Sequence, residues 1–176
     1  LVENRIASLL GVAPGRMEGA GEDWYRLRYE VAKAYTDMAA AALSVAGSYR
    51  PGYDARSRIV MEASRDGRPL AGRLVDCALA RRIEEWTRFK IAPSRENAPI
   101  ASGDFVEAWE EAARDIERFW RRIASYAARG ESGLLHPPPD AELAGAGRRA
   151  GGARDHWRSW RGYLARLGVR RAAAIA

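Results

Sequence analysis

The sequence predicts an all-α protein, a helical bundle of four main helices with additional short helices. Three observations predict this fold. Apolar residues recur at intervals of three and four, no segment alternates apolar and polar residues as a strand does, and glycine and proline gather between the periodic segments. With 176 residues, 47% of them hydrophobic, the chain is long enough to enclose a core.

The first expected helix is short, residues 2–10, and a glycine-rich loop over 11–21 follows it. The next expected helix spans about 22–48, because apolar side chains return there every seven residues. These are Trp24, Val31, Met38 and Val45. Alanines three positions further on allow another helix to approach closely.

Two further helices are expected before residue 92. The first spans about 54–65, begins at Asp54 and ends before Asp66-Gly67. The second is expected to run without interruption over 70–91, with apolar side chains on one side. These are Val75, Leu79, Ile83 and Trp86.

The clearest period belongs to the helix expected from Asp104 to about residue 130. Asp104, with Glu107 three positions later, is a typical helix start. The apolar residues then step alternately by four and three: Phe105, Trp109, Ala112, Ile116, Phe119, Ile123 and Tyr126. From all these helices we expect a core of Trp24, Leu27, Val31, Met38, Val75, Leu79, Ile83, Trp109, Ile116, Phe119 and Ile123.

The same helix carries a second apolar line, displaced from the first. Its residues are Val106, Ala113, Trp120 and Ala127. A helix that is apolar on two sides needs two partners. We therefore predict that this line is a protein interface, in a homo-oligomer or a hetero-complex.

The C-terminal part is expected to be organised differently from the body, residues 1–130. Residues 131–153 hold five glycines and three consecutive prolines and predict a linker. A last helix is expected at about 154–167, within a basic segment, 154–176, that docks on the body.

Positive charge is concentrated at this end of the chain. Residues 148–176 carry eight arginines and one acid, Asp155, so their net charge is +7 and that of residues 1–147 is −1. We predict that these arginines bind DNA, RNA or an acidic protein surface. They are Arg148, Arg149, Arg154, Arg158, Arg161, Arg166, Arg170 and Arg171. The interleaved aromatic residues either stack on bases or pack on the body. They are Trp157, Trp160 and Tyr163.

No catalytic motif occurs in the sequence. The two histidines, His136 and His156, lie in no metal-binding or nuclease pattern, and no phosphate-binding glycine motif is present. We expect no enzyme activity, no cofactor and no metal. Adjacent acidic pairs such as Glu110-Glu111 are interpreted as solvated ion-pair partners of nearby arginines. The single cysteine, Cys77, is expected to be a small core residue.

Composition also suggests the setting of the protein. No run of about 20 apolar residues and no signal-peptide pattern occurs, which favours a soluble, cytoplasmic protein. Of the 29 basic residues only Lys33 and Lys90 are lysine, and glutamine is absent. Few amides and many ion-pairing residues are typical of a thermophile, although a GC-rich genome also favours arginine.

Residues 20–128 resemble the helical domain of archaeal GINS subunits, which belong to the replicative helicase assembly. The acidic-aromatic start Glu22-Asp23-Trp24-Tyr25 and the basic end Arg88-Phe89-Lys90-Ile91 of the segment 82–91 carry the resemblance. It implies a scaffold in DNA replication that assembles through helix faces and has no catalytic residues. The small β domain usual in that family has no counterpart here.

Two other classes of assembly remain open. Small subunits of CRISPR effector complexes are helical, similar in size and line nucleic acid with basic helices. Coat proteins of filamentous archaeal viruses are helical and wrap DNA. The sequence holds no motif for either, and native mass spectrometry of the co-purified complex would distinguish the three.

Overall fold

The computed structural model describes residues 22–67, 69–99 and 105–130. Of these, 81% are helical and none is in a strand, which confirms the predicted all-α bundle. The chain divides into two compact units, residues 1–123 and 124–176, and of the second only the end of one helix is described. The expected helix over 2–10, the linker over 131–153 and the basic segment over 154–176 lie outside the described residues.

Helix α2, Glu22–Val45, is the longest element of the first half of the bundle. Small side chains on its inner face, including Ala32, Ala39 and Ala42, are buried and let α3 and α5 approach closely. The helix ends where Gly47 adopts a left-handed φ of 66° and the Ser48 N–H donates to the Leu43 carbonyl at 2.8 Å.

Helices α3, Tyr53–Asp66, and α4, Leu70–Leu74, are joined by a tight turn. Gly67 takes a left-handed φ of 63° and donates its N–H to the Ala63 carbonyl, which closes the last turn of α3. The chain then folds back so closely that Gly72 faces the Ala63 backbone. Only a residue without a side chain fits at position 72.

We expect Gly72→Ala to destabilise the protein by about 2–3 kcal/mol, near the upper range for overpacked sites. A Cβ there would overlap the Ala63 carbonyl, which is backbone and has no rotamer through which to move away. Urea unfolding followed by circular dichroism measures the loss. Gly52→Ala tests conformational strain alone, because a Cβ there would meet nothing. An equal loss in both variants would contradict the steric explanation.

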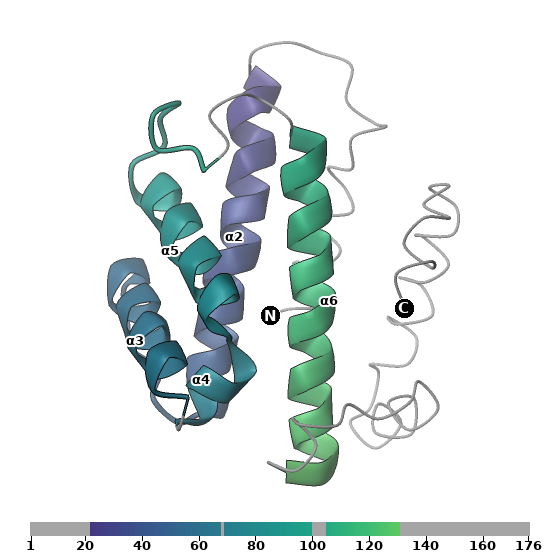
Figure 1. The fold of residues 1–176 in the computed structure, drawn as a ribbon. Coiled ribbons are helices and arrows are strands. Elements are labelled where there is room, and N and C mark those ends of the chain that lie inside the picture. Colours follow the sequence, from purple (N-terminus) through teal and green to yellow (C-terminus); the bar gives the residue numbers. More distant parts are fainter. Residues whose placement is uncertain (1–21, 68, 100–104, 131–176) are drawn as a thin grey trace, which may run out of the picture. The chain divides into compact units, whose positions relative to one another are not determined.

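The expected continuous helix over 70–91 is wrong, because it is broken at Val75. This residue is extended, with φ −123° and ψ 111°, and α5 begins anew as Cys77–Ile91. The Asp76 side chain caps the new start by accepting from the Leu79 N–H at 2.9 Å. The break turns the chain so that α5 runs back and packs against both α2 and α3 (Figure 1).

Helix α6, Phe105–Arg129, follows the predicted range and ends before Gly130, whose φ is 65°. It runs parallel to α2 and antiparallel to α5 (Figure 1). The distance between the backbone of α6 and those of the other helices is larger than the distances among α2, α3 and α5. Long side chains, such as Tyr35 and Arg82, make the contacts to α6. None of the helices within the described ranges is long and apolar enough to cross a membrane.

Most of the predicted core is confirmed. Nine of its eleven residues are buried, whereas Trp24 and Ile123 are only partly buried. The prediction missed an aromatic group between α2 and α5. Tyr35 stacks on Trp86 with ring centres 6.0 Å apart, and Trp86 meets Phe89 edge to face.

Candidate functional site

The predicted nucleic-acid contacts, Arg148 through Arg171 with Trp157, Trp160 and Tyr163, all lie outside the described residues. The predicted interface on α6 is described in part. Val106 is 44% exposed, Ala113 and Trp120 are half-buried, and the Ala127 side chain is not described. The assembly that we expect through this line therefore stays a prediction.

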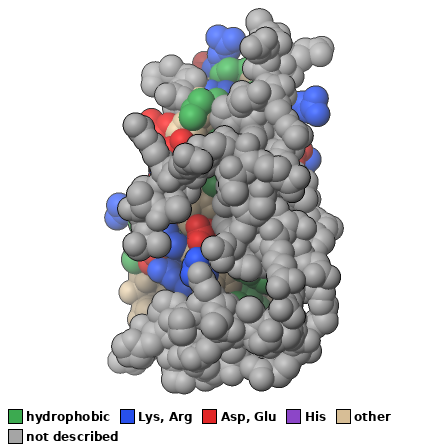
Figure 2. All heavy atoms as spheres, turned by 90° about the vertical axis from the view of Figure 1, so that its right-hand side faces the viewer, with side chains coloured by type: hydrophobic (Ala, Val, Ile, Leu, Met, Phe, Trp, Pro, Cys, Tyr) green, Lys and Arg blue, Asp and Glu red, His purple; other side chains and the backbone are tan. Residues whose placement is uncertain are grey.

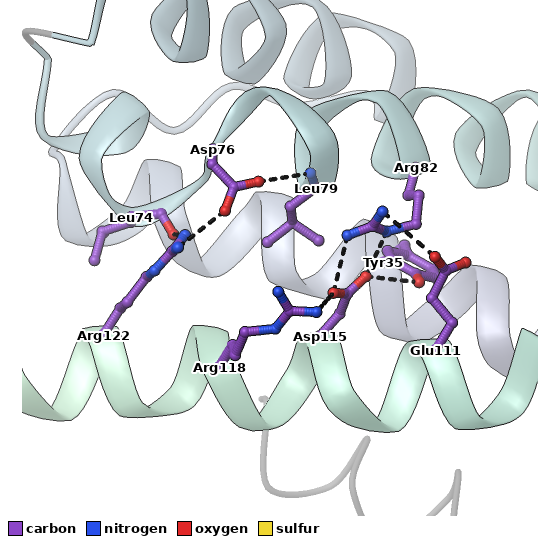
Figure 3. A network of polar contacts seen from close by, with 9 residues as sticks. All are labelled: Tyr35, Leu74, Asp76, Leu79, Arg82, Glu111, Asp115, Arg118 and Arg122. Carbon is purple, nitrogen blue, oxygen red and sulfur yellow. Dashed lines mark hydrogen bonds and ion pairs between the residues drawn. The ribbon is translucent and has the colours of Figure 1, made fainter. Parts of the chain in front are cut away.

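Asp115 of α6 is the centre of a polar network that joins three helices (Figure 3). Its side chain is only 2% exposed. The Tyr35 hydroxyl of α2 donates to Asp115 Oδ2 at 3.0 Å, and Arg82 of α5 donates to both carboxylate oxygens, at 2.6 and 3.0 Å. A buried carboxylate is stable in this position because two helices supply its hydrogen bonds.

Two more side chains complete this Asp115 network of Tyr35, Arg82, Glu111, Asp115 and Arg118. Arg118 donates to Asp115 Oδ1 at 3.3 Å, and Glu111 Oε1 lies 3.4 Å from the remaining guanidinium nitrogen of Arg82, Nη1. Burial raises the pKa of Tyr35 well above its ordinary value, and the Asp115 and Glu111 carboxylates raise it further. The phenol therefore stays protonated and acts as a fixed donor.

A second contact between α6 and α5 lies at the helix break. Arg122 of α6 donates to the Leu74 carbonyl at 3.1 Å and to Asp76 Oδ2 at 2.9 Å (Figure 3). One guanidinium thus satisfies the end of α4 and binds the carboxylate that starts α5. Burial alone would raise the pKa of Asp76, but the Leu79 N–H and Arg122 together hold it below its ordinary value.

We expect this carboxylate to make stability depend on acid. Because the pKa of Asp76 is lower in the folded state, its contribution is present above the unfolded pKa, near 4, and is lost as pH falls through the folded pKa. Asp76→Asn retains a capping side chain and removes the charge. Its cost should be about 0.5 kcal/mol at pH 7, because the carboxylate is 47% exposed and screened, and near zero at pH 2.5. A cost that stays the same at both pH values, in urea unfolding, would contradict this.

These two contacts hold α6 against α2, α4 and α5. The described residues contain no group of three or more side chains that could hold a metal ion. The expectation that Cys77 is a core residue is wrong, since its side chain is exposed at the start of α5. Its thiol donates to the Ser64 carbonyl at 3.3 Å. Position 77 is exposed because the helix restarts at Asp76.

The face of the bundle seen in Figure 2 carries acidic and basic side chains next to each other where it is described. Ion pairs along α6 are of this kind: Glu110 lies 3.5 Å from Arg114, as expected from the sequence, and Glu117 lies 2.9 Å from Arg121. The first pair is exposed and the second half-buried. In each pair the charges offset each other, and such pairs near the surface contribute little to stability.

A different surface joins α2, α3 and α5. Three cations and three tyrosine rings alternate along it without a break, and we name this set the tyrosine–cation ladder. In order, it consists of Lys33, Tyr29, Lys90, Tyr53, Arg56 and Tyr49. Its rings are among the most exposed large hydrophobic side chains described: Tyr29 is 38%, Tyr53 41% and Tyr49 48% exposed.

Each neighbouring pair in the ladder is in cation–π range. The Lys33 and Lys90 ammonium groups lie 5.0 and 4.2 Å from the Tyr29 ring centre, and Lys90 is also 5.2 Å from that of Tyr53. Arg56 lies 4.8 Å from the Tyr53 ring centre and donates to the Tyr49 hydroxyl at 2.9 Å.

The ladder carries three basic side chains, and the pKa of one of them, Lys90, is lowered. Burial lowers the pKa of Lys90, and the Lys33 ammonium lowers it further, while Tyr29 and Asp37 oppose this. Lys33 is paired with Glu30 at 2.6 Å. The lysines that gather on Tyr29 are the only two in the chain.

The sequence held a partial signal for this surface. Tyr29 and Lys33 are four residues apart, and Tyr53 and Arg56 are three apart, so each pair shares one side of its helix. Tyr49 lies before Pro51-Gly52, outside either helix, so helical spacing does not place it. Only the fold joins the two groups, since it places Lys90, from the end of α5, between Tyr29 and Tyr53.

Comparison with protein-family models, with curated proteins and with solved structures finds no match to this chain.

Proposed function

We propose that this chain is a non-catalytic helical subunit that assembles with other proteins and binds nucleic acid. The tyrosine–cation ladder is the observation that carries the proposal. Exposed tyrosine rings beside Lys33 and Lys90 suit a single strand, because rings stack on bases of any sequence while the ammonium groups bind the phosphates. Arg56 is buried, and its guanidinium contacts Tyr49 and Tyr53. The arginine-rich residues 148–171 would add a second set of phosphate contacts.

The resemblance to archaeal GINS subunits extends this proposal to a replication assembly. A scaffold needs helix faces that meet other subunits, and the second apolar line of α6 is such a face. Native mass spectrometry of the complex purified from its source tests the extension. Replication proteins would support it, whereas an RNA-guided complex or a viral filament would replace it.

Fluorescence anisotropy with single- and double-stranded oligonucleotides, at two or more salt concentrations, tests nucleic-acid binding. Lys33→Ala/Lys90→Ala should flatten the log–log salt dependence for a single strand by about 1.4, because each phosphate contact contributes about 0.7. Arg81→Ala/Arg114→Ala is the matched control. It also removes two positive charges, but from exposed positions outside the ladder, and should bind nearly as wild type.

Substitutions of Tyr29 distinguish base stacking from binding by charge alone. Tyr29→Ala should weaken single-strand binding about tenfold, whereas Tyr29→Phe retains the ring and should bind nearly as wild type, since one stacked base is worth about 1–3 kcal/mol.

Arg154→Ala/Arg158→Ala/Arg161→Ala tests the C-terminal contacts separately and should flatten the log–log salt dependence by about two to three. If no oligonucleotide binds at low salt, the proposal is wrong and an acidic protein becomes the better partner.

A further inference from the structure

Arg28 of α2 is a buried charge whose hydrogen bonding is incomplete. It is 2% exposed, and one of its terminal nitrogens is buried without a hydrogen-bond partner. The other reaches only the Trp24 carbonyl, at 3.5 Å. Within the described part of the chain no carboxylate pairs with Arg28. A buried guanidinium without full pairing is destabilising, so its presence here requires an explanation.

A second arginine makes the same place more positive. The guanidinium carbons of Arg28 and Arg95 lie 4.2 and 5.6 Å from the centre of the Trp24 ring. Burial lowers the pKa of Arg28, and the Arg95 charge lowers it further. Arg95 is exposed, which gives the pair one side that faces solvent. Two cations near one indole repel each other, and a bound anion would offset that repulsion.

The ends of two helices add to this potential. α2 begins at Glu22 and α6 at Phe105, both at the same end of the bundle (Figure 1). The Phe105 ring centre is 5.9 Å from the Arg28 guanidinium, so α6 starts beside the arginine. Helix N-termini carry partial positive charge and bind phosphate and sulfate readily. Glu22 and Asp23 of α2 and Glu107 of α6 belong to the same first turns and offset part of this charge.

We propose that Arg28 and Arg95, over Trp24, form a binding site for a tetrahedral oxyanion, a phosphate that is either free or at the end of a larger molecule. Its oxygens would accept from the unpartnered nitrogen of Arg28 and from Arg95. The planar forks of two arginines suit such a ligand, which would neutralise both charges. This inference does not depend on the ladder or on nucleic-acid binding.

Thermal unfolding of the full chain in inorganic phosphate, against chloride at equal ionic strength, tests the site. We expect phosphate to raise the wild-type melting temperature by about 3–5 °C at saturation. Phosphate also acts on protein stability through general exclusion from the surface, so the comparison is with variants. Arg95→Ala should lose most of the rise. Arg88→Ala, which removes an exposed arginine of α5, should retain it.

Arg28→Met gives a second test, in which the melting temperature of the variant relative to wild type should depend on the anion. In chloride this variant should melt no lower than wild type, because it removes an unpaired buried charge and keeps a long side chain. In phosphate the order should reverse. A 5′-phosphorylated dinucleotide, compared with its dephosphorylated form, shows whether a terminal phosphate also enters.

Two results would overturn the proposal. One is an equal response to phosphate in wild type and Arg95→Ala. The other is a response that appears only after Glu22→Gln/Asp23→Asn/Asp104→Asn. Glu22 and Asp23 directly precede Trp24 in the sequence, and Asp104 directly precedes Phe105. The side chains of these three acids lie outside the described residues. Such a result would mean that the chain's own carboxylate already fills the site.

Discussion

Asp115→Ala should destabilise the bundle by about 3 kcal/mol, at the lower end of the range for removing one member of a buried ion pair. The substitution leaves the Tyr35 hydroxyl buried without an acceptor, and it leaves Arg82 facing a vacant position. The loss should be at the lower end because the Arg82 side chain is 21% exposed and can recover some water. Urea unfolding monitored by circular dichroism measures it.

Two control variants distinguish the stabilisation by the Asp115 network from that by an ordinary surface ion pair. Glu110→Ala removes an acid of the same helix that is 51% exposed and pairs with an exposed arginine, so its cost should stay below about 1 kcal/mol. Tyr35→Phe removes one donor and keeps Arg82 on Asp115, so about 1 kcal/mol is expected. If Asp115→Ala costs no more than Glu110→Ala, the network does not hold the helices together.

The helices that could be predicted from sequence are those whose signal is local. The step of four and three over α6 and the seven-residue repeat over α2 are properties of one helix, and the structure retains both. The turn signals at Gly67 and Gly130 are local too, because each glycine takes a left-handed φ that other residues avoid.

Features that depend on two distant segments could not be predicted in the same way. The break at Val75 is stabilised by Arg122, which lies 48 positions after Leu74 in the chain. Asp115 and Tyr35 are 80 positions apart, and each alone reads as an ordinary helical residue. Arg28 likewise looks like one more solvated arginine, and only its burial beside Trp24 sets it apart.

The two candidate binding surfaces differ in the same way: one is a local property of the sequence, and the other depends on distant segments. The charge of residues 148–176 is a property of sequence, and it predicts an anionic partner whatever the fold. The tyrosine–cation ladder instead requires α5 to bring Lys90 between two tyrosines from other helices. A helical subunit that binds a strand through both would therefore hold one contact defined by composition and another defined by tertiary packing.

Phe119→Ala should destabilise the protein by about 3–5 kcal/mol, the range for a large aromatic residue removed from a packed core. Phe119 is completely buried, and it belongs to the stripe that faces the bundle, with Trp109 and Ile116. α6 makes few close backbone approaches to the other helices, so large side chains fill the space between them. A cavity there cannot collapse unless the helix moves.

The matched control is Ile91→Ala, an apolar truncation at a position that is 55% exposed. It should cost less than about 1 kcal/mol, because little apolar surface returns to water. Phe119→Leu fills part of the cavity and should fall between the two. Urea midpoints, with the slope of the transition checked for each variant, measure all three. Equal losses for Phe119→Ala and Ile91→Ala would mean that α6 does not pack on the bundle through the stripe that its sequence period predicts.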